Sequence, residues 1–217
     1  MISGKIFYIW ILCSFLLFLS CVLPPEQEYE PVKGNDASYA LLQIYRTMMP
    51  GNKWTLISYL ETVYIKYPDF AEGEEIMGWI NYLNNDTKSA LDYWQKSNPS
   101  HLDLQAGMMF YNADQLNSAK VIEYGENILQ QSPEWHLGET TLRNYGVQYY
   151  NQSFPINHFD IRVLLAEAYF VTGRLEDSLT MVKSVDTTIH LQPDDPELAN
   201  KLAPIIARLI EFYVLFH

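Results

Sequence analysis

The chain has 217 residues, 48% of them hydrophobic, and its 14 basic against 26 acidic residues give a formal charge of −12. Such an acidic surface repels phosphate backbones and anionic lipid headgroups, which argues against a nucleic-acid-binding protein. Cys13 and Cys21 are the only cysteines, so a disulfide-rich scaffold and a cysteine metal site are excluded.

The first 21 residues have the order of an export signal. Lys5 precedes an uncharged apolar run from Ile6 to Leu19, and Ser20 and Cys21 follow it. A basic start, an apolar core of roughly 7–15 residues and a small residue at the cleavage point define a secretory signal. Residues 1–20 are therefore predicted to be removed. An uncleaved membrane anchor and plain secretion are the alternatives, since the run extended past the cysteine reaches the lower limit of a spanning helix.

The segment Phe18-Leu19-Ser20-Cys21 resembles the lipobox of bacterial lipoproteins, with Phe18 in place of the usual leucine. The resemblance implies that the Cys21 sulfur carries diacylglycerol, whose acyl chains anchor the protein in a membrane. Val22 stands where an aspartate would retain such a protein at the inner membrane. The implied location is therefore the outer membrane, facing the periplasm or the cell surface. Residues 21–35 are predicted to be the lipidated cysteine and a flexible, proline-rich tether.

From Ala37 onward, apolar residues recur at spacings of three and four, which predicts helices throughout. No convincing alternating strand of six residues is present. Short turns made of Asn, Asp, Gly and Pro interrupt the pattern, as at residues 50–52, 84–86 and 172–173. We expect about ten helices, paired as antiparallel hairpins, in one all-α domain over residues 36–217.

Pairs of small residues twelve positions apart recur across three of these turns. The pairs are Gly78 and Ala90, Gly107 and Ala119, and Ala166 and Ser178. Two helices approach closely only where small side chains meet, so each pair is predicted to lie face to face across a hairpin. An aromatic residue follows the first member of each pair by three or four positions, and these aromatics are Tyr82, Phe110 and Tyr169.

Residues 165–179 carry the small residue, the aromatic, the turn glycine and the second small residue in the order of a tetratricopeptide repeat (TPR). Residues 78–94 resemble the same repeat, whereas residues 134–158 do not match it cleanly. The resemblance implies a TPR-like solenoid of about five antiparallel helical hairpins, whose curved surface binds a protein or peptide. An irregular helical bundle is the alternative.

Residues 51–101 also resemble the first repeats of BamD, a family of outer-membrane assembly lipoproteins. The similarity lies in the segments Gly51-Asn52-Lys53-Trp54, Leu60-Glu61, Tyr67-Pro68, Asn85-Asp86, Ala90-Leu91 and Asn98-Pro99-Ser100-His101. That family combines a lipidated cysteine, a short tether and five repeats. The resemblance implies that these N-terminal hairpins contact a client tail or a barrel-associated partner.

The TPR resemblance also implies a partner-binding surface, because the first helix of each hairpin lines the concave face of such a solenoid. The implied positions are Glu72, Glu75, Trp79, Tyr82, Leu104, Met108, Tyr111, Asn112, Asp160, Val163, Glu167 and Phe170. An aromatic surface with acidic flanks suits a peptide or helix that has apolar anchors and nearby Lys or Arg. The alternative places Trp79 and Phe170 in the core, where Trp54, Trp94 and Trp135 are also expected.

Motifs of catalysis are missing from the sequence. There is no glycine-rich phosphate loop, GxSxG, HExxH or CxxC. The five histidines have no i,i+3 or i,i+4 pairing, and the adjacent Glu74 and Glu75 point to different faces of a helix. We predict no catalytic residue, metal site or cofactor, and we expect that the protein is not an enzyme.

Residues 204–216 are strongly apolar, where the last repeat of a solenoid should present a polar outer face. We expect this segment to pack back on the last hairpin. The alternative is a docking surface for a partner or for a second copy of the chain. The segment is too short for a membrane span and is interrupted by Arg208 and Glu211.

These features predict a cell-envelope lipoprotein with a non-enzymatic, TPR-like scaffold that mediates protein–protein interaction. Its partner is an envelope protein or peptide of unknown identity. One alternative is a BamD-like accessory factor in outer-membrane protein assembly. The other is a ligand-binding or transporter-accessory protein with a buried pocket.

Overall fold

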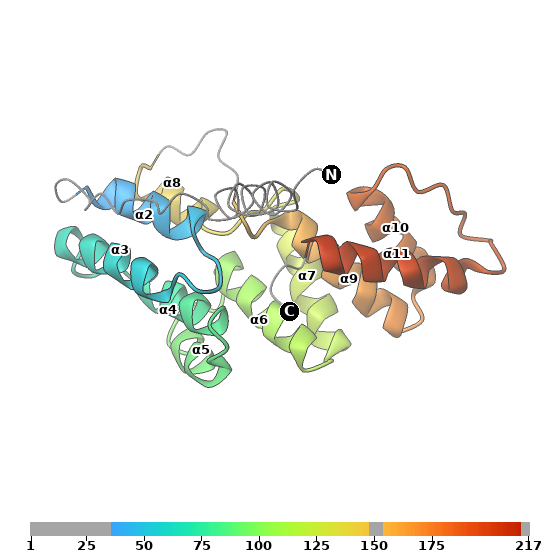
Figure 1. Ribbon diagram of the computed structural model, residues 1–217, viewed down its shortest axis with the longest axis horizontal. Coiled ribbons are helices and arrows are strands. Elements are labelled where there is room, and N and C mark those ends of the chain that lie inside the picture. The colour runs from blue at the N-terminus through green and yellow to red at the C-terminus, as the bar shows by residue number, and fades with distance from the viewer. Residues whose placement is uncertain (1–35, 148–153, 214–217) are drawn as a thin grey trace, which may run out of the picture. The chain divides into compact units, whose positions relative to one another are not determined.

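The computed structural model describes residues 36–147 and 154–213, and these residues are largely helical (Figure 1). The helices are α2 (Ala37–Arg46), α3 (Lys53–Lys66), α4 (Gly73–Tyr82), α5 (Thr87–Trp94), α6 (Leu102–Asp114), α7 (Ser118–Gln131), α8 (Glu139–Asn144), α9 (His158–Val171), α10 (Leu175–Val185) and α11 (Leu198–Tyr213). The described residues contain no strand, only a single β-bridge between His136 and Asn157. The all-α prediction is confirmed for this part of the chain. The predicted signal, Cys21 and the tether lie outside it.

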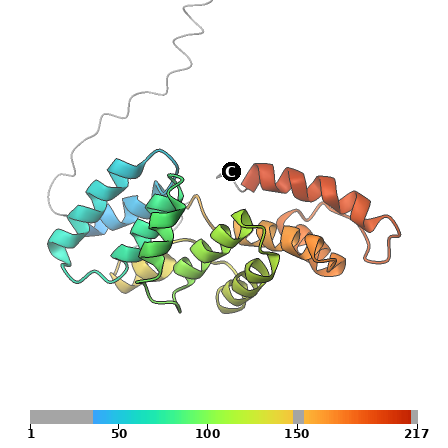
Figure 2. The same ribbon diagram turned by 90° about the horizontal axis from the view of Figure 1, so that it is seen from below.

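Consecutive helices pack in pairs, namely α2 with α3, α4 with α5, α6 with α7, and α9 with α10. Contacts between the pairs join α3 to α4, α4 to α6, and both α6 and α7 to α9. The short helix α8 instead lies beside α2 in Figures 1 and 2, where the backbone of Gly138 packs on the Tyr45 ring. A segment from the middle of the chain thus covers the first hairpin.

Four helices end in the same kind of turn. One residue in each turn has a positive φ, and these residues are Asn85, Leu116, Gly146 and Gly173. The residue that follows donates its backbone N–H to the carbonyl five positions earlier, at 2.8–2.9 Å. This is the Schellman arrangement, which satisfies carbonyl groups that the helix end leaves open. Glycine or asparagine fits such a backbone at little cost, so Leu116 is the unusual member.

The indole of Trp94 in α5 fills a slot between two glycines. A Cβ atom at Gly78 in α4 would lie 2.2 Å from Trp94 Nε1, and one at Gly107 in α6 would lie 2.4 Å from Trp94 Cζ2. Trp94 Nε1 also donates a hydrogen bond of 3.3 Å to the backbone carbonyl of Glu75. Because neither glycine has a side chain, the Trp94 indole packs between them. This contact brings α4, α5 and α6 together.

Of the three predicted contacts between small residues, one is confirmed and one is wrong. Ser178 Oγ donates to the Ala166 carbonyl at 2.8 Å, so α9 and α10 meet there as expected. The prediction for Gly107 and Ala119 is wrong, because Ala119 is exposed and Gly107 faces Trp94. Gly78 is closest to Trp94 as well, although Ala90 is buried.

The tryptophans divide between core and surface. Trp94 and Trp135 are buried, as predicted. Trp54 is 78% exposed, so its assignment to the core is wrong. It lies in the first turn of α3, whose buried residues are Leu56, Leu60 and Val63, and its own position falls off that stripe.

The C-terminal helix α11 packs against α9 and α10, which confirms the expectation for residues up to Tyr213. Figures 1 and 2 both show it alongside this hairpin. Leu198, Leu202, Ile206 and Leu209 recur every three or four residues and are buried, while Phe212 is exposed. No helix within the described ranges is both long enough and apolar enough to cross a bilayer.

Gly78→Ala is expected to lower the free energy of unfolding by about 1–3 kcal/mol, and Gly78→Leu by at least as much, because the added carbon must displace the buried Trp94 indole. Urea denaturation measures the effect. In a Trp94→Leu background the same Gly78→Ala change should cost less, since the obstructing ring is gone. An equal cost in both backgrounds would mean that the tryptophan does not limit this contact.

Candidate functional site

The twelve predicted partner-binding residues separate into a buried and a partly exposed set. The buried ones are Glu72, Glu75, Trp79, Tyr82, Leu104, Asn112, Asp160 and Val163. Their side chains belong to the interior, so Trp79 lies in the core, as the alternative interpretation held. Met108, Tyr111, Glu167 and Phe170 are partly exposed. For these four, a contact with a partner stays a prediction.

Three buried acidic residues and a half-buried histidine gather where α4, α6 and the segment before α8 meet. We call this cluster the acidic junction, and its members are Glu72, Glu75, His101 and Asp103. The Asp103 carboxylate accepts hydrogen bonds from Trp135 Nε1 at 3.0 Å and from the Gly138 backbone N–H at 2.8 Å. The Asp103 carbonyl accepts a further one from Trp79 Nε1 at 3.0 Å. Asp103 therefore ties α6 to residues 32 and 35 positions later in the chain.

The two glutamates have fewer partners. His101 Nδ1 lies 3.3 Å from Glu75 Oε2, which makes an ion pair when the imidazole is protonated. Tyr145 Oη donates to Glu72 Oε2 at 3.1 Å. Glu75 is only 2% exposed and its carboxylate has no other hydrogen-bonding partner among the described residues.

Burial governs the protonation of this cluster. Loss of water raises the pKa of Asp103 well above its usual value, and the nearby charge of Glu75 adds to the effect. Burial also raises the pKa of Glu75, against the opposing influence of His101. The hydrogen bond with Glu75 in turn raises the pKa of His101. The acidic junction thus favours positive charge nearby, which would offset the buried carboxylates.

A pocket of about 190 Å³ opens beside the acidic junction. It is lined by Glu75, Ser100, His101, Leu102, Asp103, Gln131, Thr140 and Thr141. Among the described residues, no group of three or more His, Cys, Asp or Glu side chains is placed to hold a metal ion.

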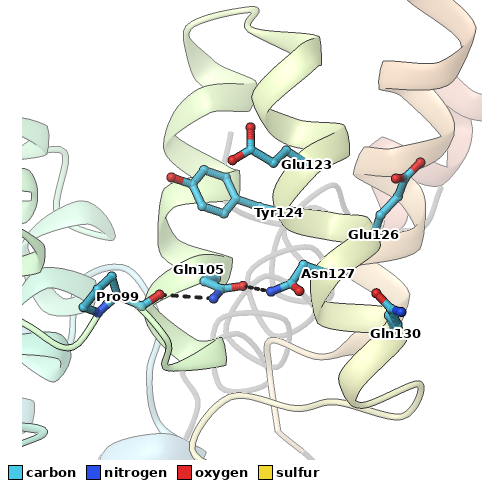
Figure 3. A pocket seen from close by; sticks show the side chains of 7 residues that line it. All are labelled: Pro99, Gln105, Glu123, Tyr124, Glu126, Asn127 and Gln130. Atoms are coloured by element: carbon cyan, nitrogen blue, oxygen red, sulfur yellow. Dashed lines mark hydrogen bonds between the residues drawn. The ribbon is translucent and has the colours of Figure 1, made fainter.

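A wider hollow of about 550 Å³ lies along α7 (Figure 3). Two of its three amide side chains are already engaged, because Asn127 Nδ2 donates to Gln105 Oε1 and Gln105 Nε2 donates to the Pro99 carbonyl. Glu123 pairs with Lys120 at 2.7 Å, and Glu126 accepts from Tyr169 Oη at 2.7 Å. Since these polar groups already have partners within the protein, this hollow is a weak candidate for ligand recognition.

An apolar groove of about 290 Å³ runs between the α6–α7 turn and α9. It is lined by Ala113, Leu116, Asn117, Ser118, Val121, Leu164, Glu167, Ala168 and Val171. Leu116 is 88% exposed and Val171 is 67% exposed, while Val121 and Leu164 are buried. Two large apolar side chains therefore stand in solvent beside an apolar floor, which is a feature of interaction surfaces.

The backbone at Leu116 makes this exposure more informative. Its φ is +55°, a region that costs a residue with a Cβ about 1–2 kcal/mol. Asn85 and Gly173 occupy the equivalent places in two other turns. Leu116 was not predicted from sequence, although an alignment of the turns Asn84-Asn85-Asp86, Gln115-Leu116-Asn117 and Thr172-Gly173-Arg174 places it at the left-handed position. Glu167 is the one predicted partner-binding residue that lines this groove.

Comparisons of the chain with protein-family models, with curated proteins and with solved structures found no match.

Asp160, another predicted binding residue, has a structural role at the start of α9. Its Oδ2 accepts the Asn157 backbone N–H at 2.8 Å, and the Asn157 side chain accepts the Asp160 backbone N–H in return, which forms a capping box. Asn157 Oδ1 also accepts the Phe159 N–H at 2.9 Å. Burial raises the pKa of Asp160 to about 7, although the hydrogen bonds from the backbone oppose this shift.

Asp160→Asn should gain stability relative to the wild type as the pH rises from about 4 to 7. The folded protein holds the Asp160 proton more tightly than the unfolded chain, so this side chain stabilises most below its unfolded pKa and loses that contribution through about pH 7. The difference in free energy of unfolding between the variant and the wild type should grow by at most about 1.4 kcal/mol per pH unit. Urea denaturation of both proteins at several pH values measures it. A constant difference would mean that Asp160 ionises normally.

Proposed function

We propose that this protein is an exported, lipid-anchored scaffold whose helical domain binds another envelope protein and catalyses no reaction. The TPR-like sequence pattern supports this proposal, as do the paired helices with matching turns and the packing of α7 on the next hairpin. The lipid-anchor part of the proposal comes from the sequence around Cys21.

The apolar groove beside Leu116 carries the proposal. A solvent-exposed leucine in a left-handed turn lowers stability and gains almost no packing in return, so its presence calls for a contact outside the domain. Glu167 is the only charged residue in the lining of this groove. The partner is therefore expected to insert an apolar side chain, carried on a helix or extended peptide, with a Lys or Arg close to it.

Leu116→Asn is expected to raise the free energy of unfolding by about 1 kcal/mol, because asparagine tolerates the left-handed backbone and the lost side chain is exposed. Asn85→Leu is the matched control, and it should lower stability by a similar amount. Thermal or urea denaturation checks both. A loss of stability in Leu116→Asn would show that the leucine serves the fold itself.

The same substitution tests the binding role. A photo-crosslinking amino acid at Val171 is expected to form a discrete adduct in the bacterial envelope, which mass spectrometry would identify. The adduct should disappear in the more stable Leu116→Asn variant. The crosslinker at Trp54, which is at least as exposed as Val171, is the control, because that residue lies on α3 and does not line the groove. Equal labelling at both positions, or an adduct indifferent to Leu116→Asn, would contradict the proposal.

Cys21→Ala should release the protein from membranes, because the acyl chains would have no attachment point. Each buried methylene contributes about 0.8 kcal/mol, so two long chains hold a protein durably. Fractionation of lysed cells, with immunoblotting of soluble and membrane fractions, measures the change. A variant that still sediments with the membrane would rule out lipidation as the anchor.

A further inference from the structure

The pocket at the acidic junction lies at the N-terminal end of α6, whereas the apolar groove lies at the C-terminal end of the same helix. The two share no lining residue. The pocket is therefore a second site, independent of the proposed scaffold function.

Glu75 is the unusual group in this pocket. An ionised carboxylate offers about four acceptor positions, and a buried one is stable only when donors fill them. Asp103 meets this requirement, with an N–H donor on each oxygen. Glu75 is 2% exposed, and its one polar side-chain partner in the described chain is His101. Glu75 lines the pocket and its Oε2 is buried without a well-aligned hydrogen bond among the described residues, so a donor bound in the pocket would supply the missing partner.

The charge balance selects a cation. Glu75 and Asp103 line the pocket and Glu72 is close enough to act on Glu75, whereas His101 is the only lining group that can become positive. No Lys or Arg lines the pocket. An anion would meet two carboxylates at close range, which is unfavourable at low dielectric. A bound cation would offset the burial that raises the pKa of Glu75.

The remaining lining residues limit the kind of cation. A metal ion needs several ligating side chains, and the described residues include no such group. A guanidinium binds best when its two parallel N–H groups reach both oxygens of one carboxylate, but His101 already pairs with one oxygen of Glu75, and both oxygens of Asp103 are occupied. An ammonium is compact and carries three donors, which suit the Glu75 carboxylate and the hydroxyls of Thr140 and Thr141. Leu102 offers apolar surface to a short carbon stem.

We propose that this pocket binds an alkylammonium group, supplied either by a small primary amine or by the side chain of a lysine in another protein. Glu75 is the counter-ion, and Thr140 lies at the exposed part of the lining.

Titration of the full chain in detergent with n-propylammonium, followed by calorimetry and by amide NMR spectra, tests this proposal. A peptide with one internal lysine forms the second arm, and sodium propionate and propanol are control compounds. We expect saturable binding of at least one ammonium probe, with shifts centred on residues 100–103 and 140–141. Binding of propylammonium indicates a free amine, and binding of the peptide alone indicates a lysine side chain.

Two variants address the site in different ways. Glu75→Gln removes the charge with little change in shape, and Thr140→Phe narrows the pocket at an exposed position without touching the carboxylates. Each should weaken ammonium binding at least tenfold. Glu176→Gln, on the exposed first turn of α10, should bind as the wild type does. Far-ultraviolet circular dichroism confirms that each variant is folded.

The proposal is overturned if neither ammonium probe binds at millimolar concentration, since the pocket would then hold water only. It is overturned as well if a folded Glu75→Gln variant binds propylammonium as tightly as the wild type, or if propanol competes equally well. None of these results depends on the groove at Leu116, so the scaffold proposal stands or fails separately.

Discussion

The packing of one tryptophan against two glycines sets the arrangement of the middle of this domain. The Trp94 indole occupies space that any side chain at Gly78 or Gly107 would take, and it contacts the ring of Trp79 at a centroid separation of 5.7 Å. Interiors are close-packed, so a shape match of this kind fixes how helices meet more strictly than general hydrophobicity does. The slot draws α4, α5 and α6 together, and the residues that form the acidic junction come from the same region.

Three indole N–H groups are satisfied at this region. Trp79 and Trp94 donate to the backbone carbonyls of Asp103 and Glu75, and Trp135 donates to the Asp103 carboxylate. A buried donor without a partner costs about 1–3 kcal/mol, so these bonds hold the large rings in single orientations. Two hydrogen-bond donors offset the cost of burying the Asp103 carboxylate, whereas the Glu75 carboxylate is paired only with His101. That difference between two neighbouring carboxylates separates a structural residue from a candidate binding residue.

Four helices of the domain end in the same kind of turn, and in one of these turns a leucine occupies the left-handed position that glycine or asparagine occupies in the others. Glycine and asparagine fit the left-handed position, and Leu116 does so at a cost. Strain held in the backbone is a reason to look for function, particularly where the strained side chain is exposed beside an apolar floor. The unusual residue type at Leu116, in a turn whose geometry is otherwise repeated, supports a function for the groove between α6 and α9.

The sequence by itself determined the helical class, the approximate number of helices and most of the turns, because the spacing of apolar residues and the Asn, Gly and Pro breakers act locally. It also identified Ala166 and Ser178 as a contact and predicted that the C-terminal helix packs back on the last hairpin.

Only the tertiary structure decided which partners those residues meet. Spacing along the chain suggested that Gly107 faces Ala119, but a tryptophan from the preceding hairpin fills the space. It likewise gave no sign that Asp103 binds residues more than thirty positions away, or that Glu75 is buried beside a pocket while Trp54 is exposed. Contacts between distant segments depend on volume, hydrogen-bond geometry and burial in three dimensions, and a local pattern carries none of these quantities.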